Sequence, residues 1–248
     1  MNSLPKTPRV GVITQARTTS TRLPRKVLLP LGDQSVLDHH LDRLATSGYP
    51  VIVATTTNGS DDEVAALAEH RGVGCFRGSE TDVLSRFHGA AADNALDVVV
   101  RVTSDCPLVD GKVVAQAVEA FLDADDPGLF LSNTLQRTYP RGFDVEVFSA
   151  AALAAADNRA AATFEREHVT PYLYRGPERL RTAALTRAED RSHYRVTLDT
   201  SDDLLLLRTM VEQYEAHRLA CDEIVKILDG HPELLALNAR VEQKQLHE

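Results

Sequence analysis

The stretch R-V-G-V-I-T, residues 9–14, runs into the basic segment A-R-T-T-S-T-R-L-P-R-K, residues 16–26, and this junction decides the fold. A near-continuous apolar run rich in valine and isoleucine is typical of a strand that is buried on both faces. Similar runs recur at residues 51–55, 73–76 and 97–103, and helical patterns separate them. We therefore predict an α/β fold with a mostly parallel, doubly wound sheet that helices cover on both sides.

Three helices are expected between these strands. Ser35 can cap the first of them. The other two should begin at residues 61–62 and 81–82, where an aspartate or threonine precedes an apolar stripe. In doubly wound sheets, ligands bind beyond the carboxyl ends of the strands. This rule indicates three candidate binding loops: residues 15–26, 56–61 and 104–110.

The second half of the chain changes character. In G-F-D-V-E-V-F, the apolar residues Phe143, Val145 and Val147 alternate with Asp144 and Glu146. This alternation predicts an antiparallel strand with one polar face. The later elements that we expect are an alanine-rich helix at 150–162, a short helix ending near Pro171, strands at 180–186 and 194–198, and helices at about 201–217 and from 221 onward.

The domain organisation that we expect is simple. Residues 1–248 should form a single domain, with a smaller, antiparallel lobe at about residues 130–180. This lobe and the apolar C-terminal helices offer surfaces on which a second copy could pack, so a homodimer is expected.

Composition excludes several classes of protein. The formal net charge is −9, so general binding to nucleic acid is not expected. The longest apolar runs fall far short of the ~20 residues that cross a bilayer. The opening M-N-S-L-P-K-T-P lacks the apolar centre of a secretory signal, and Cys75, Cys106 and Cys221 show no disulfide or zinc spacing. We expect a cytoplasmic protein with reduced thiols and no membrane partner.

Four cations, Arg17, Arg22, Arg25 and Lys26, lie close together in the segment 16–26. In an acidic chain, such a cluster should meet a local anion. The segment matches neither the Walker pattern nor G-x-G-x-x-G. Its backbone N–H groups, hydroxyls and guanidinium forks nevertheless suit a triphosphate. The alternative is a solvated loop whose arginines form weak surface ion pairs.

The same segment resembles the A-R-x-x-S-x-R-L-P-x-K signature of the cytidylyltransferases that make CMP-activated sugars, the CMP-KDO and CMP-sialate synthetase superfamily. Longer motifs are similar to the spore-coat polysaccharide synthesis protein F branch, among them F-R-G-S-E-x-D-V-L-x-R-F, R-V-T-x-D-C-P-L-V-D and E-R-E-H-V-T-P-Y. The resemblance runs from about residue 10 to the tail N-A-R-V-E-Q-K. The chain departs from the branch at Arg25, where glycine is frequent, and at Ser201, where proline is usual.

The resemblance implies a Rossmann-like fold of the nucleotide-diphospho-sugar transferase type and transfer of CMP from CTP to an acidic acceptor, with release of pyrophosphate. Arg22, Lys26 and Asp105 would be catalytic. Mg²⁺ would be held by Asp105 and Asp199, with Asp202 as a weaker third candidate. The residues that would bind the nucleotide are Ala16, Arg17, Ser20, Arg22, Lys26, Thr55, Arg77, Asp82 and Thr103.

The acceptor pocket is the less defined part of the predicted site. A sugar that carries a carboxylate would need a cation such as Arg141. For the residues at 139–146, the alternative is a polar sheet face in contact with solvent. For His168, the alternative is a structural hydrogen bond. The residues assigned to the acceptor are Tyr139, Arg141, Asp144, Glu146 and His168.

Simpler structural roles stay open for several residues. Asp105 precedes a turn with a proline, where aspartate is common. Ser201 and Asp202 can cap a helix. Asp82 and Arg86 can form an ion pair one helical turn apart.

Other functions also stay open. A glycosyltransferase of similar fold usually holds its metal with D-x-D, but the sequence at this position reads D-C-P. A non-catalytic nucleotide-binding protein would not need the aspartates. Cys106 is not expected to be a nucleophile, because packing is the commoner role of a lone cysteine. The acceptor could be a sugar acid or another acid, such as a phosphonate.

Overall fold

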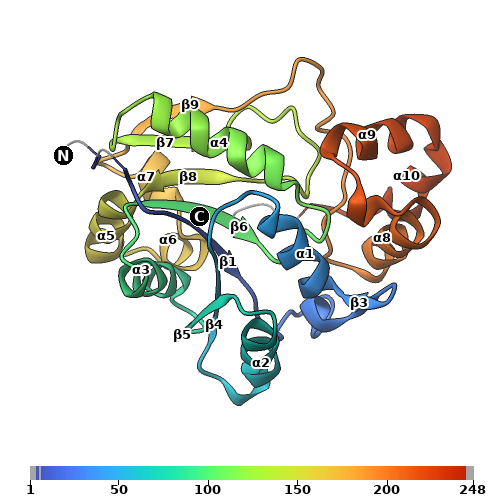
Figure 1. The fold of residues 1–248 in the computed structure, drawn as a ribbon, viewed down its shortest axis with the longest axis horizontal. Helices are drawn as coiled ribbons and strands as arrows, with labels where there is room; N and C mark the ends of the chain where they lie inside the picture. The colour runs from blue at the N-terminus through green and yellow to red at the C-terminus, as the bar shows by residue number, and fades with distance from the viewer. Residues whose placement is uncertain (1–3, 6, 244–248) are drawn as a thin grey trace.

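The computed structural model describes residues 4–5 and 7–243, and its centre is a seven-stranded sheet with the order β5-β4-β1-β6-β8-β7-β9 (Figure 1). Four of these strands are parallel neighbours, as the apolar runs predicted. Because they point the same way, their carboxyl ends meet at one edge of the sheet. These strands are β1 (Val10–Gln15), β4 (Val51–Thr56), β5 (Gly74–Gly78) and β6 (Val98–Thr103).

The second half of the chain extends the same sheet. Strand β8 (Glu146–Ser149) runs antiparallel to both β6 and β7 (Leu129–Ser132), and β9 (Arg181–Ala184) pairs in parallel with β7. Residues 129–184 therefore add a mixed half to the sheet. A separate hairpin joins β2 (Pro30–Leu31) to β3 (Gln34–Ser35).

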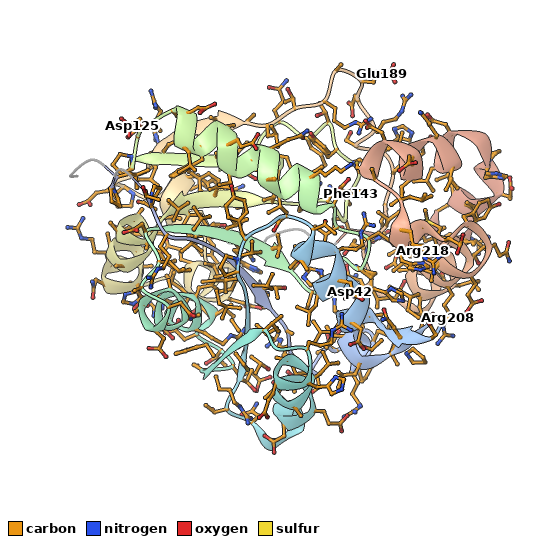
Figure 2. The ribbon with its side chains drawn as sticks, viewed as in Figure 1. Asp42, Asp125, Phe143, Glu189, Arg208 and Arg218 are labelled. Atoms are coloured by element: carbon orange, nitrogen blue, oxygen red, sulfur yellow. The ribbon has the colours of Figure 1, made fainter. Side chains whose placement is uncertain are left out.

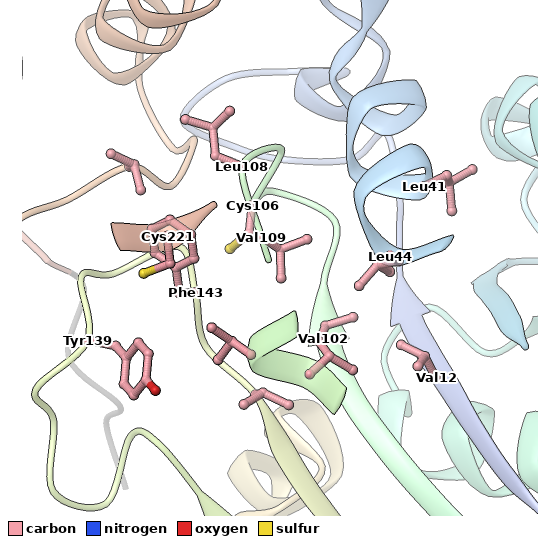
Figure 3. Packing of buried hydrophobic residues seen from close by; sticks show 14 of the residues in the cluster. Val12, Leu41, Leu44, Val102, Cys106, Leu108, Val109, Tyr139, Phe143 and Cys221 are labelled. Carbon is pink, nitrogen blue, oxygen red and sulfur yellow. The ribbon is translucent and has the colours of Figure 1, made fainter. Parts of the chain in front are cut away.

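Helices cover both faces of the sheet. Alternate residues of one strand enter different cores: Val12 of β1 packs with α1 and α4, whereas Ile13 packs with α3 and α5. Figure 3 shows Val12 in the first core with Leu41 and Leu44. On this face lie α1 (Val36–Ala45), α2 (Asp62–His70) and α4 (Gly111–Asp123), and on the other lie α3 (Val83–Asp93), α5 (Ala150–Arg159), α6 (Thr163–His168) and α7 (Pro171–Arg175).

The chain closes with a group of helices beside the first core. They lie to the right in Figure 1, where α8 packs on α10 and α10 on α9. In Figure 2, Phe143 lies in the interior between this group and the sheet, whereas Glu189 lies at the edge of the molecule. The helices are α8 (Ser201–Tyr214), α9 (Cys221–Gly230) and α10 (Pro232–Asn238).

Three details differ from the sequence prediction. The polar face predicted for the strand at 142–148 is wrong, because Glu146 is buried, pairs with Arg101 and accepts a hydrogen bond from Thr170. Residues 194–198, all described, form only one isolated bridge, between Arg141 and Arg195, instead of a strand. Pro171 begins α7 as well as following α6, since proline fits the first turn of a helix. Within the described residues, no helix is long and apolar enough to cross a membrane.

Candidate active site

A cleft of about 390 Å³ opens at the carboxyl ends of β1 and β6. The loop that follows β1 forms one wall, and α3 and the end of α6 form another. The predicted binding residues Arg17, Ser20 and Arg22 line it, and so do Ala16, Lys26, Thr103, Asp105 and Asp199. The cleft therefore brings together the basic loop and the two distant aspartates.

Lys26 lies at the point where the two aspartates converge. Its Nζ donates to Asp105 Oδ2 at 2.8 Å, to Asp199 Oδ1 at 2.9 Å and to the Leu198 carbonyl at 2.8 Å. Burial would raise the pKa of Asp105, but the Lys26 ammonium and hydrogen bonds outweigh it and lower this pKa to about 2. Burial would likewise lower the pKa of Lys26, yet the two carboxylates raise it. The Asp105 carboxylate and the Lys26 ammonium are therefore both charged at neutral pH.

Two arginines complete this cluster of charges. Arg22 lies 3.0 Å from Asp199 Oδ2, and Arg195 lies 2.8 Å from the same oxygen. Arg195 also pairs with Asp203, which is fully buried and caps α8 together with Thr200. Asp199 therefore sits among three cations.

Sequence reasoning missed Arg195. Arg195 lies four and eight residues before Asp199 and Asp203, a spacing typical of a helix. Residues 195–200 are not helical, however, so the sequence pattern does not predict these ion pairs. Ser201 and Asp202 do not cap α8 as predicted. Thr200 and Asp203 make the cap instead.

Asp61 anchors the basic loop. It is fully buried and accepts hydrogen bonds from Thr18 N at 2.7 Å, from Thr18 Oγ1 at 2.6 Å and from the Thr56 hydroxyl. These bonds outweigh the effect of burial and lower the pKa of Asp61. Its carboxylate thus ties the loop to the end of β4.

Arg25 points away from the cleft and pairs with Glu63 at 2.6 Å. Its φ of 58° lies in the left-handed region. Glycine takes this conformation without strain, whereas a residue with a side chain adopts it rarely.

Three of the residues predicted to bind the nucleotide do not line the cleft. Thr55 is buried within β4. Arg77 pairs with Asp62 at 2.7 Å and donates to the Thr56 carbonyl. Asp82 caps α3 and pairs with Arg166, so the alternative i,i+4 pair with Arg86 is replaced by a contact between α3 and α6.

The predicted acceptor residues are divided. Arg141 and Asp144 line a cavity of about 140 Å³ that also touches Thr103, Asp105 and Asp199, and so adjoins the main cleft. His168 lines the main cleft instead. Tyr139 lies under Arg187 in a different groove, and Glu146 is buried against Arg101.

Cys106 belongs to the packing of the first core. Figure 3 shows it beside Leu108 and Val109. Burial raises the pKa of its thiol well above the usual value. A thiol that stays protonated is a poor nucleophile, which agrees with the prediction that it is not one.

This fold, with a cationic loop that faces two carboxylates beside the carboxyl ends of the parallel strands, is that of a nucleotidyltransferase. The sequence model of the cytidylyltransferase family matches residues 11–246, and the chain belongs to that family. The uncharacterized protein MJ1063 of Methanocaldococcus jannaschii is 36% identical, over 96% of this chain and 98% of that protein. The spore coat polysaccharide biosynthesis protein SpsF of Bacillus subtilis is 30% identical, over 89% and 94%.

Solved structures agree with this assignment. A cytidylyltransferase from Leptospira borgpetersenii has a TM-score of 0.89 at 34% identity, over 97% of this chain and 100% of that one. A CMP:2-keto-3-deoxy-manno-octonic acid synthetase complexed with CTP has a TM-score of 0.60 at 17% identity, over 83% and 99%. Mycobacterium tuberculosis Rv0371C, complexed with manganese, has a TM-score of 0.56 at 19% identity, over 81% of this chain and 98% of that one. These last two show the fold alone, and the predicted family and fold are confirmed.

Proposed function

We propose that the protein transfers CMP from CTP to an acidic small-molecule acceptor and releases pyrophosphate. The observation that carries this proposal is the convergence of Lys26 on both Asp105 and Asp199, with Arg22 beside them. The similarity to SpsF supports a place in polysaccharide biosynthesis. A sugar acid is the acceptor that this favours, and a phosphonate is the alternative.

In the reaction, a deprotonated acceptor oxygen attacks the α-phosphorus of CTP, and the bond to the β-phosphate oxygen breaks. Negative charge then grows on the leaving pyrophosphate. Arg22 lines the cleft and can donate hydrogen bonds to its oxygens. Lys26 lies beside it and adds a positive charge, although its three N–H groups bind Asp105, Asp199 and the Leu198 carbonyl here. Little covalent chemistry is asked of the protein, whose part is to position and neutralise phosphates.

Mg²⁺ fits the point where the carboxylates meet. Its preferred ligands are oxygens from one or two carboxylates and from phosphates, and Asp105 and Asp199 supply the former. Lys26 Nζ lies at this point in the structure, so its ammonium would be displaced by the ion towards the phosphates. Among the described residues, no group of three or more metal-binding side chains gathers, so the phosphates would complete the ligand set. When bound, the ion would neutralise charge on the α-phosphate.

Arg141 is suited to the acid group of the acceptor. Arg141 lines the cavity beside the aspartates, together with Asp144. Its guanidinium forms no hydrogen bond or ion pair with any described side chain, although the Asp144 carboxylate lies near enough to favour its charge. Burial and the neighbouring Arg137 lower its pKa, so an anion there would be stabilised. A carboxylate or phosphonate can accept two hydrogen bonds from the Arg141 guanidinium at once.

The test is pyrophosphate release with CTP, ATP, GTP or UTP, Mg²⁺ and a panel of sugar acids and phosphonates. We expect release with CTP and an acidic acceptor only. Asp105→Asn should abolish it, whereas Asp93→Asn, on the exposed end of α3, should not. Equal release with all four nucleotides, or full activity in Asp105→Asn, would show that the proposal is wrong.

A further inference from the structure

Arg86 is a buried cation that forms no direct ion pair within the described residues. It lies on α3, is 1% exposed, and lines the cleft that holds the basic loop and the aspartates, next to Val83. Nη1 donates to the Ser79 carbonyl at 2.9 Å, whereas Nε has no partner among the described residues. No carboxylate in the described part of the chain lies within ion-pair distance of it. Burying a charge in this way is costly unless something compensates it.

Arg43 shows how a purely structural arginine of this chain is satisfied. It is also buried, on α1, but its Nε donates to the Val109 carbonyl and its Nη1 to the His217 carbonyl. It borders none of the nucleotide cleft. Arg86, by contrast, keeps hydrogen-bonding capacity next to the cleft.

The surrounding backbone makes room for Arg86. A Cβ on Gly78, at the end of β5, would lie 3.2 Å from Arg86 Cγ and 3.4 Å from its Cβ. Burial and the nearby Arg17 also lower the pKa of Arg86 to about 10, although the carboxylates of Asp61 and Glu80 partly oppose this shift. This site therefore disfavours a bare cation and gains from a bound group that accepts hydrogen bonds.

The position of Arg86 suggests which part of the nucleotide it meets. The phosphate-binding cations Arg22 and Lys26 come from the loop wall, together with the aspartates. The α3 wall offers an apolar side chain, Val83, and one guanidinium. An apolar surface with a single placed polar group is what a planar base requires.

We propose that Arg86 binds the base of CTP and makes the site prefer cytosine to uracil. The inference rests on the function proposed above. A guanidinium only donates hydrogen bonds. Cytosine presents two adjacent acceptors, O2 and N3, on one edge, and the fork of Arg86 matches that pair. In uracil, N3 carries a hydrogen, so a donor faces a donor.

The test measures CTP and UTP binding by calorimetry, with Mg²⁺ and without acceptor, to the wild type, Arg86→Met and Arg86→Lys. We expect Arg86→Met to weaken CTP binding by about 10- to 100-fold, as loss of hydrogen bonds from a charged group does. The CTP-to-UTP affinity ratio should approach one. Arg86→Lys keeps the charge but loses the fork, so its ratio should fall too. The matched control Arg43→Met should keep the wild-type ratio.

The outcomes separate the two proposals. A wild type that binds CTP no better than UTP overturns the proposed function. A wild type that prefers CTP, with the same preference in a folded Arg86→Met, overturns only the role of Arg86. The role of Arg86 would also be overturned if Arg86→Met bound CTP and UTP more weakly by the same factor, so that the CTP-to-UTP affinity ratio stayed at the wild-type value. If Arg86→Met does not fold, the ratio in Arg86→Lys decides.

Discussion

Replacing Lys26 with methionine removes the cation shared by Asp105 and Asp199. All three side chains are mostly buried, with exposed fractions of 13%, 24% and 15%. Breaking a buried pair and leaving its charge uncompensated costs about 3–5 kcal/mol. Asp199 keeps Arg22 and Arg195, so we expect the lower end, about 3 kcal/mol less stability at pH 7.

The loss should depend on pH with a definite sign. In the wild type, Asp105 has a pKa of about 2 and stays ionised at pH 4. Without Lys26, burial dominates and raises the pKa of Asp105, so the variant takes up a proton as the pH falls and its unpaired charge disappears. The stability difference should therefore be largest at pH 7 and smaller at pH 4.

Urea unfolding followed by circular dichroism, at pH 7 and pH 4, measures this difference. Lys112→Met is the matched control, since Lys112 is exposed on α4, and it should change stability by less than about 0.5 kcal/mol. An equal loss for Lys26→Met at both pH values would refute the reasoning, because the cost would then not come from the unpaired carboxylate.

Three further predictions concern neighbouring groups. His40 is fully buried between Thr14 and the Cys106 carbonyl, and burial lowers its pKa to about 4. An unfolded histidine binds a proton near pH 6.5, so wild-type stability should fall by up to about 3 kcal/mol between pH 6.5 and 4. In His40→Gln, the free energy of unfolding should not fall in this way with pH. The same dependence on pH in the variant and the wild type would contradict the role of His40. Asp61→Asn should loosen the basic loop and weaken CTP binding roughly tenfold, because a neutral amide replaces a charged acceptor; calorimetry with unchanged affinity would oppose this. Arg141→Met should raise the KM for the acceptor with little change in the KM for CTP, and steady-state kinetics showing the reverse would remove Arg141 from the acceptor site.

Much of the architecture could be read from the chain. The four parallel strands follow from apolar runs that alternate with helices, and parallel geometry then places their carboxyl ends together. That is why a loop near residue 20 and an aspartate at 105 could be expected in one cleft. The convergence of Asp199, almost a hundred residues later, was expected from the family resemblance and from its place after a predicted strand at 194–198, but that strand does not form.

Other features lie beyond sequence patterns. Alternation in G-F-D-V-E-V-F favoured a solvated polar face, yet β8 lies between β6 and β7 and both of its faces are covered. A buried ion pair such as Glu146 with Arg101 breaks the rule that charged residues face water. The same holds for Arg86, whose helical spacing from Asp82 indicated a surface pair. Tertiary packing, which local patterns do not encode, decides these cases.

The central claim is that the basic loop holds the triphosphate of CTP. Calorimetric titration with CTP and with CMP, at equal Mg²⁺, tests it most directly. We predict that CTP binds about 100-fold more tightly than CMP, since two or more charge-assisted hydrogen bonds reach only the outer phosphates. Arg22→Met should lose most of this difference. Equal affinities for CTP and CMP in the wild type would contradict the account.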